Sequence, residues 1–156
     1  DVGTERSTLL NLEDIFGTAQ DDQLIGDNQD NTIKGGSGDD IIVGGEGADQ
    51  LYGGDGSDTF KISSVNESGV GSGNRDVIFD FDTSLDQIDL TGLVGSDFSF
   101  IGTSEFANDS LVSQVRFNAG SRLIEIDSDA NAVADAEIEL ADLDGSSLGF
   151  DDFTVG

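Results

Sequence analysis

Residues 35–61 read GGSGDDIIVGGEGADQLYGGDGSDTFK, which is three copies of the nonapeptide GGxGxDxUx, where U is an apolar residue. Two further copies precede them without a gap, GTAQDDQLI at 17–25 and GDNQDNTIK at 26–34. These two keep the opening glycine, the polar sixth position and the apolar eighth position, but they lose the glycines at positions two and four. A strict short repeat of this kind is typical of a fold built from stacked units.

Each part of the repeat has a physical role. Glycines permit the positive φ angles of a tight loop, and the residues from position six onward form a short strand with one inward apolar side chain. Nine residues then make half a coil, so that loops on one edge recur every 18 residues. The inward stripe contains six residues, Ile15, Leu24, Ile33, Ile42, Leu51 and Phe60. We predict an all-β fold with a parallel β-roll.

The sixth positions predict a metal site. Loops that lie 18 residues apart stack, which places their polar side chains in columns beside the carbonyl groups of the glycine loops. We expect about three or more ions, bound most weakly where the neutral Asn31 or the glycine-poor loop around Gln20 takes part. The predicted ligands are Asp22, Asn31, Gly36, Gly38, Asp40, Gly45, Gly47, Asp49, Gly54, Gly56 and Asp58.

Composition narrows the choice of metal and of partners. The chain has 33 acidic and 6 basic residues and a net charge of −27, which disfavours nucleic acids and anionic membranes as partners. It has no histidine and no cysteine, so only oxygen ligands remain and Ca²⁺ is the expected ion. The same absence removes the base or the nucleophile of serine and thiol hydrolases, and we expect no enzymatic activity. No apolar run is long enough to insert into a membrane.

Folding of the repeats is expected to depend on the metal. A stripe of six apolar side chains is a small core for five repeats, and columns of carboxylates repel one another. Glycine- and aspartate-rich stretches also occur as flexible linkers, but five copies in one phase favour a metal-binding repeat.

The second half also has a β pattern. Apolar residues alternate in four short segments, each expected to be a strand with one buried face: Val77, Phe79 and Phe81; Val115 and Phe117; Ile124 and Ile126; Ile138 and Leu140. Residues 118–121 are expected to form a hairpin turn. We predict that this half is a β-sandwich-like segment that caps the roll.

An acidic segment in the second half resembles the start of a helix-loop-helix calcium loop. Its candidate ligands are Asp127, Asp129, Asn131 and Asp135. However, Ala132 stands where such a loop requires glycine, and no glutamate follows at the twelfth position. We therefore favour a solvated or turn-forming role for these acids.

The nonapeptides resemble those of RTX proteins, with hemolysin-type calcium-binding repeats. The stretch DVIFDFDTSLDQIDLTGL (76–93) is similar to the segment that follows the β-roll in serralysin-type proteases and in R-modules of mannuronan epimerases. Residues 115–155 resemble the serralysin-type C-terminal domain. The resemblance also raises Asp76 and Asp86 as candidates to complete a site with the final loops.

The resemblance implies a secreted, extracellular bacterial module that passes a type I secretion exporter unfolded and folds on calcium. Its export region lies at the C-terminal end, although here the closing DDFTV is followed by Gly156, a departure from the family's usual ending. We expect a monomer with a lead-in at 1–16, the roll at 17–61, and a capping and secretion domain at 62–156, belonging to a larger protein. The alternative is a polysaccharide-binding R-module of an epimerase-like enzyme, or the terminal part of an RTX adhesin.

Overall fold

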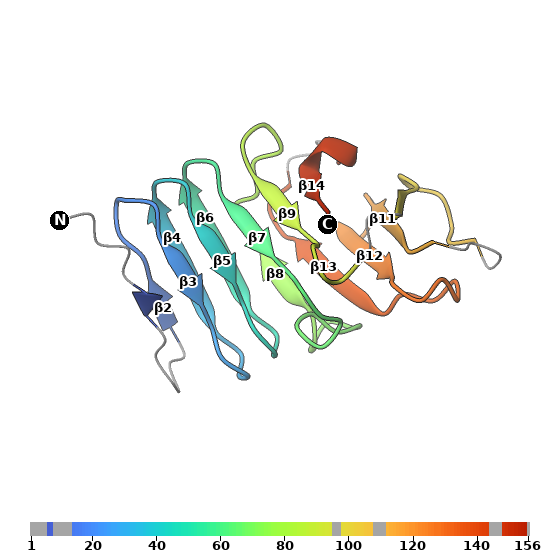
Figure 1. Ribbon diagram of the computed structural model, residues 1–156, viewed down its shortest axis with the longest axis horizontal. Helices are drawn as coiled ribbons and strands as arrows, with labels where there is room; N and C mark the ends of the chain where they lie inside the picture. Colours follow the sequence, from blue (N-terminus) through green and yellow to red (C-terminus); the bar gives the residue numbers. More distant parts are fainter. Residues whose placement is uncertain (1–5, 8–13, 95–97, 108–111, 144–147, 156) are drawn as a thin grey trace.

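The computed structural model describes residues 6–7, 14–94, 98–107, 112–143 and 148–155. Their strands form two sheets that enclose one hydrophobic core (Figure 1). The first sheet has six strands, all parallel, in the order β1-β3-β5-β7-β9-β14. These strands are β1 (Arg6–Ser7), β3 (Gln23–Ile25), β5 (Ile41–Val43), β7 (Thr59–Lys61), β9 (Gln87–Asp89) and β14 (Phe153–Thr154).

The second sheet has eight strands in the order β10-β11-β12-β13-β8-β6-β4-β2. It is parallel from β2 to β13 and antiparallel from β13 through β12 to β11, where β10 adds in parallel. Its strands are β2 (Asp14–Phe16), β4 (Thr32–Ser37), β6 (Gln50–Asp55), β8 (Asp76–Ile78), β10 (Ser99–Phe100), β11 (Gln114–Asn118), β12 (Leu123–Asp127) and β13 (Ala136–Leu140).

The repeats form the predicted parallel β-roll. Consecutive strands alternate between the two sheets, and the strands that pair within a sheet are 18 residues apart, as in Ile15 with Ile33 and Leu24 with Ile42. The six residues of the predicted stripe are all buried, with at most 6% of their surface exposed. Figure 1 shows the strands following one another along the long axis, with loops at both edges.

The roll continues beyond the last nonapeptide. Ile78 of β8 pairs beside Leu51 of β6, and Ile88 of β9 pairs beside Phe60 of β7. Residues 62–75 therefore form an inserted loop between two coils of the roll. Arg75 at its end is ion-paired with Glu137 and Glu139 of β13, which fixes the loop against the sheet.

One predicted strand has the opposite orientation. We expected Val77, Phe79 and Phe81 to share a buried face. Phe81, beyond the end of β8, is buried as expected, but within and next to the strand Ile78 is fully buried while Val77 and Phe79 are only half-buried. Pairing with β6 places Ile78 on the inward stripe, and Phe79 instead stacks on Tyr52 outside the roll, with ring centroids 4.7 Å apart. The register of β8 thus follows its parallel neighbour.

The C-terminal half extends both sheets and forms the expected β-rich cap. The alternating residues of β11, β12 and β13 are buried as predicted: Val115, Phe117, Ile124, Ile126, Ile138 and Leu140. The predicted turn joins β11 to β12, where Gly120 N–H donates to the Asn118 side chain. A short 3-10 helix, η1 (Phe150–Asp152), precedes β14. No helix in the described ranges has the length and apolarity of a membrane span.

Candidate metal centre

Two columns of buried side chains follow the loop edges of the roll. In each column the backbone N–H of one residue donates to the side-chain Oδ1 of the next, over 2.8 to 3.0 Å. The preceding turn therefore fixes the side chain of every column residue after the first. The columns consist of Asp22, Asp40, Asp58 and Asp86 on one edge, and of Asn31, Asp49 and Asp76 on the other.

In the three complete repeats the second carboxylate oxygen has no hydrogen-bond partner within the described part of the chain. Oδ2 of Asp40, Asp49 and Asp58 is buried and accepts no hydrogen bond from any described residue. These side chains are at most 1% exposed. A buried charged oxygen without a partner is costly, so these atoms require a proton or a cation.

Glycine is needed beside these oxygens. A Cβ on Gly35 would lie 2.2 Å from Oδ2 of Asp40, and a Cβ on Gly44 would lie 2.2 Å from Oδ2 of Asp49. The glycines at the second and fourth positions of the complete repeats have positive φ angles, which side chains adopt only with strain. They are Gly36, Gly38, Gly45, Gly47, Gly54 and Gly56, the six glycines predicted as carbonyl ligands. All eleven predicted ligands thus lie on the two loop edges, and their role as ligands stays a prediction.

The electrostatics of the columns oppose ionisation in the absence of a cation. Burial, with the neighbouring carboxylates as a further cause, raises the pKa of Asp40 to about 6 and that of Asp49 to about 7. The same causes raise the pKa of Asp76 to about 8 and that of Asp86 to about 6. A divalent cation would reverse the balance, and a cradle of carboxylates and backbone carbonyls suits Ca²⁺.

The acids after the repeats join the columns. Asp76 accepts the N–H of Asp49, and Asp86 accepts the N–H of Asp58. Both acids that the family resemblance suggested therefore lie beside the final loops. Asp80 was missed in the sequence, although it accepts the N–H groups of Gly53 and Gly54 at 2.8 and 3.1 Å. Asp80 lies outside the nine-residue pattern, which is why no signal in the sequence pointed to it.

The acidic segment near residue 130 forms a turn. The carboxylates of Asp127, Asp129 and Asp135 offer oxygens within 4.8 Å of one another. Asp127 accepts hydrogen bonds from the N–H groups of Asn131 and Ala132, and Asp135 accepts them from the backbone N–H and the hydroxyl group of Ser128. Ala132 has a φ of +69°, where a calcium loop would have glycine. These contacts agree with the turn-forming role that the sequence favoured.

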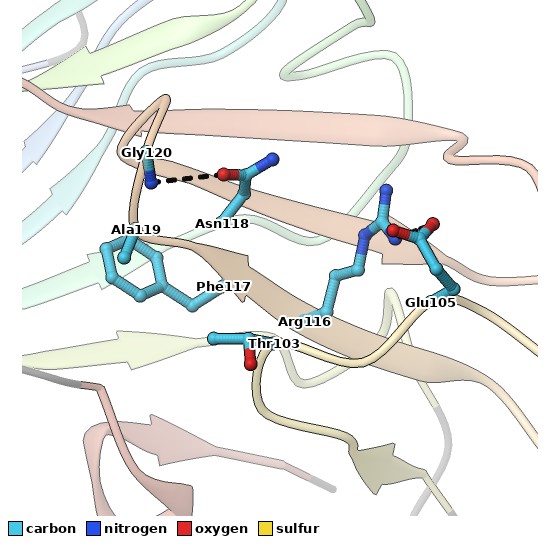
Figure 2. A pocket seen from close by; sticks show the side chains of 7 residues that line it. All are labelled: Thr103, Glu105, Arg116, Phe117, Asn118, Ala119 and Gly120. Carbon is cyan, nitrogen blue, oxygen red and sulfur yellow. Dashed lines mark hydrogen bonds and ion pairs between the residues drawn. The ribbon is translucent and has the colours of Figure 1, made fainter.

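A cavity of about 320 Å³ lies beside β11 and is lined by none of the column residues (Figure 2). Arg116 on its wall donates to both oxygens of Glu125, at 2.9 and 3.0 Å, and to Glu105 at 2.6 Å. The Phe106 ring lies 4.5 Å from the guanidinium carbon. The guanidinium is therefore already neutralised by two carboxylates and offers little to an acidic ligand.

A parallel β-roll with columns of buried carboxylates at its loop edges defines a calcium-binding repeat module. Residues 13–41 and 25–60 match the family of the RTX calcium-binding nonapeptide repeat, in four copies. The matched residues are RTX calcium-binding repeats, and this supports a calcium-binding module.

Solved structures extend the similarity beyond the repeats. The AlgE6R3 subunit of the mannuronan C5-epimerase from Azotobacter vinelandii is 26% identical, with a TM-score of 0.58, over 99% of this chain and 85% of that one. The AlgE6R2 subunit of the same enzyme is 25% identical, with a TM-score of 0.54, over 90% of this chain and 91% of that one. No curated protein sequence matches the chain.

Proposed function

We propose that the chain is a non-catalytic module of a larger extracellular bacterial protein, and that it folds on calcium after type I export. The proposal rests mainly on the buried Oδ2 atoms of Asp40, Asp49 and Asp58, which accept no hydrogen bond from any described residue. Such a fold is unfavourable without a cation, so calcium binding and folding are one reaction. Extracellular calcium modules bind at about 10⁻⁴ to 10⁻³ M, a concentration that the cytosol does not reach.

Calcium titration followed by circular dichroism tests this proposal, with magnesium as the control ion. We expect β-structure to appear cooperatively near millimolar calcium and not with magnesium, which keeps its waters in flexible sites. Tyr52 is the only tyrosine and there is no tryptophan, so tyrosine fluorescence reports the stacking of Tyr52 on Phe79. A chain that is fully folded in excess chelator would contradict the proposal.

We place the export region in the C-terminal segment. In the folded chain Phe153 is 5% exposed, and β14 pairs with β9, which follows directly after Asp86 of the column. Because this segment is buried and paired in the fold, an exporter that recognises it would have to bind it before the roll folds. A secretion assay of the chain with residues 148–156 deleted tests this role, and normal export of the deletion variant would exclude it.

The second candidate function is polysaccharide binding, supported by the similarity to the AlgE6 subunits across nearly the whole chain. The described basic side chains limit the ligand. Lys61, Arg75 and Arg116 are paired with acids, and Lys34 lies over the rings of Phe16 and Tyr52. The exposed Arg122 donates to the backbone carbonyl of Ala141. Because most of these cations are engaged and the net charge of the chain is −27, a polyuronate would need calcium bridges, whereas a neutral glycan would not.

Glycan pull-down with and without calcium separates these cases. Retention on alginate only with calcium would support the calcium-bridged form, and retention on a neutral glycan in both conditions would support the other. No retention on either material would leave the calcium-dependent folding module as the function.

A further inference from the structure

Loops at equivalent positions of the roll satisfy their sixth-position side chain in two different ways. In loop 17–22 the N–H and the hydroxyl of Thr18 both donate to Oδ2 of Asp22, at 2.6 and 2.8 Å. In loop 26–31 the N–H of Asp27 donates to the side-chain oxygen of Asn31 at 2.9 Å. These loops are closed by their own second residue, with no need for an ion at that oxygen.

The same closure recurs at the other end of the roll. The N–H of Asp82 donates to Oδ2 of Asp86 at 2.9 Å, again across four residues. This loop is not a nonapeptide, so the closure does not depend on the repeat sequence. The loops between the two ends, 35–40, 44–49 and 53–58, are those whose Oδ2 atoms have no described partner.

The backbone at the second position explains the difference. Gly36, Gly45 and Gly54 have φ angles of +120°, +102° and +105°. Thr18 has a side chain and no positive φ, and the same holds for the other two closing residues. A positive φ turns the amide away from the acid of its own loop. The N–H of Gly54, for example, donates to Asp80 in the next turn and not to Asp58.

We infer that the second residue of each loop decides whether it takes an ion. The three complete loops, with glycine at positive φ, each bind one calcium through their unpartnered oxygen. The closed loops at 17–22, 26–31 and 82–86 are metal-free ends of the roll. Asp22 and Asn31, predicted as ligands from the sequence, then serve as acceptors in the backbone ladder. This inference rests on the proposed calcium-dependent folding.

Calcium stoichiometry of the full chain tests the inference, by equilibrium dialysis and metal analysis at saturating calcium. We expect three ions in the wild type, two in Asp49→Asn and still three in the matched control Asp22→Asn. The double variant Thr18→Gly with Gln20→Gly converts loop 17–22 to GGAGDD, which fits the complete template, and should gain one ion. Tyrosine fluorescence in calcium checks that each variant is folded.

The outcomes separate the two proposals. Loss of an ion in Asp22→Asn, or three ions in the double variant, would overturn the inference while leaving calcium-dependent folding intact. If Asp49→Asn fails to fold, the ion counts of Asp22→Asn and of the double variant still test the inference. A wild type that binds no calcium would overturn the proposed function itself.

Discussion

The backbone N–H of Asp40 donates to Oδ1 of Asp58 at 2.9 Å, one full coil further along the chain. Asp40 is held in the same way by the N–H of Asp22, and the second oxygen of both Asp40 and Asp58 has no partner among the described residues. At these two positions the ladder and the metal centre share the same side chains. Removing the charge of Asp40 or Asp58 should weaken both the ion site and the stacking of two coils.

Acid should partly replace calcium. The pKa values of Asp40, Asp49 and Asp76 in the fold are raised above the ordinary value of 3.8. The stability that their protonated carboxyl groups give to the metal-free fold is therefore fully present below a pH of about 3.8. It is lost as the pH rises through about 6 to 8. In chelator, circular dichroism should show more β-structure at pH 5 than at pH 8, and Asp49→Asn should flatten this response.

Acid should also weaken calcium binding, since a proton and the ion compete for the same oxygens. The calcium midpoint measured by tyrosine fluorescence should rise as the pH falls from 8 to 5. Magnesium in place of calcium serves as the control. A midpoint that is independent of pH would show that these acids do not bind the ion.

Gly44→Ala should strongly impair the calcium-bound fold. Its Cβ would lie 2.2 Å from Oδ2 of Asp49, and overpacking of this kind costs about 1 to 3 kcal/mol. Gly73→Ala is the matched control, since nothing lies within 4 Å of its Cβ. Urea unfolding at saturating calcium measures both variants. Equal stabilities would contradict the cradle at Gly44.

Phe153→Ala should release the C-terminal strand. Phe153 is 5% exposed and contacts Phe100, and truncation of a buried phenylalanine costs about 3 to 5 kcal/mol. Phe150→Ala, at a position that is 56% exposed, should cost much less. Limited proteolysis followed by mass spectrometry should show cleavage near residue 150 in Phe153→Ala with calcium present. In the wild type the same cleavage should occur only in chelator.

Phe60→Ala should destabilise the roll by about 3 to 5 kcal/mol, because this fully buried ring closes the inward stripe and contacts Phe81. The comparison is Phe16→Ala, since Phe16 is 65% exposed on the outer face. Calcium midpoints by circular dichroism measure the two effects. A similar shift in both variants would mean that the contacts of Phe16 and Tyr52 with Lys34 on the outer face stabilise the roll as much as the core does.

The nine-residue period alone determined the roll, its inward stripe from Ile15 to Phe60 and the position of the polar columns. This was possible because a strict repeat places equivalent residues one coil apart whatever the rest of the chain does. The orientation of β8 was not accessible in the same way. Residues 62–75 interrupt the period, and only pairing with Leu51 on β6 places Ile78 inside and Phe79 outside.

From the sequence, Asp22, Asp40 and Asp58 were all predicted as ligands because all three occupy the sixth position of a repeat, and the glycine-poor loop of Asp22 was expected only to bind more weakly. The tertiary structure separated them. The Thr18 amide reaches the acid of its own loop, whereas glycines at positive φ turn their amides away and leave a buried oxygen without a partner. Residue types along the chain specify which groups could bind an ion, but backbone direction and burial decide which of them need one.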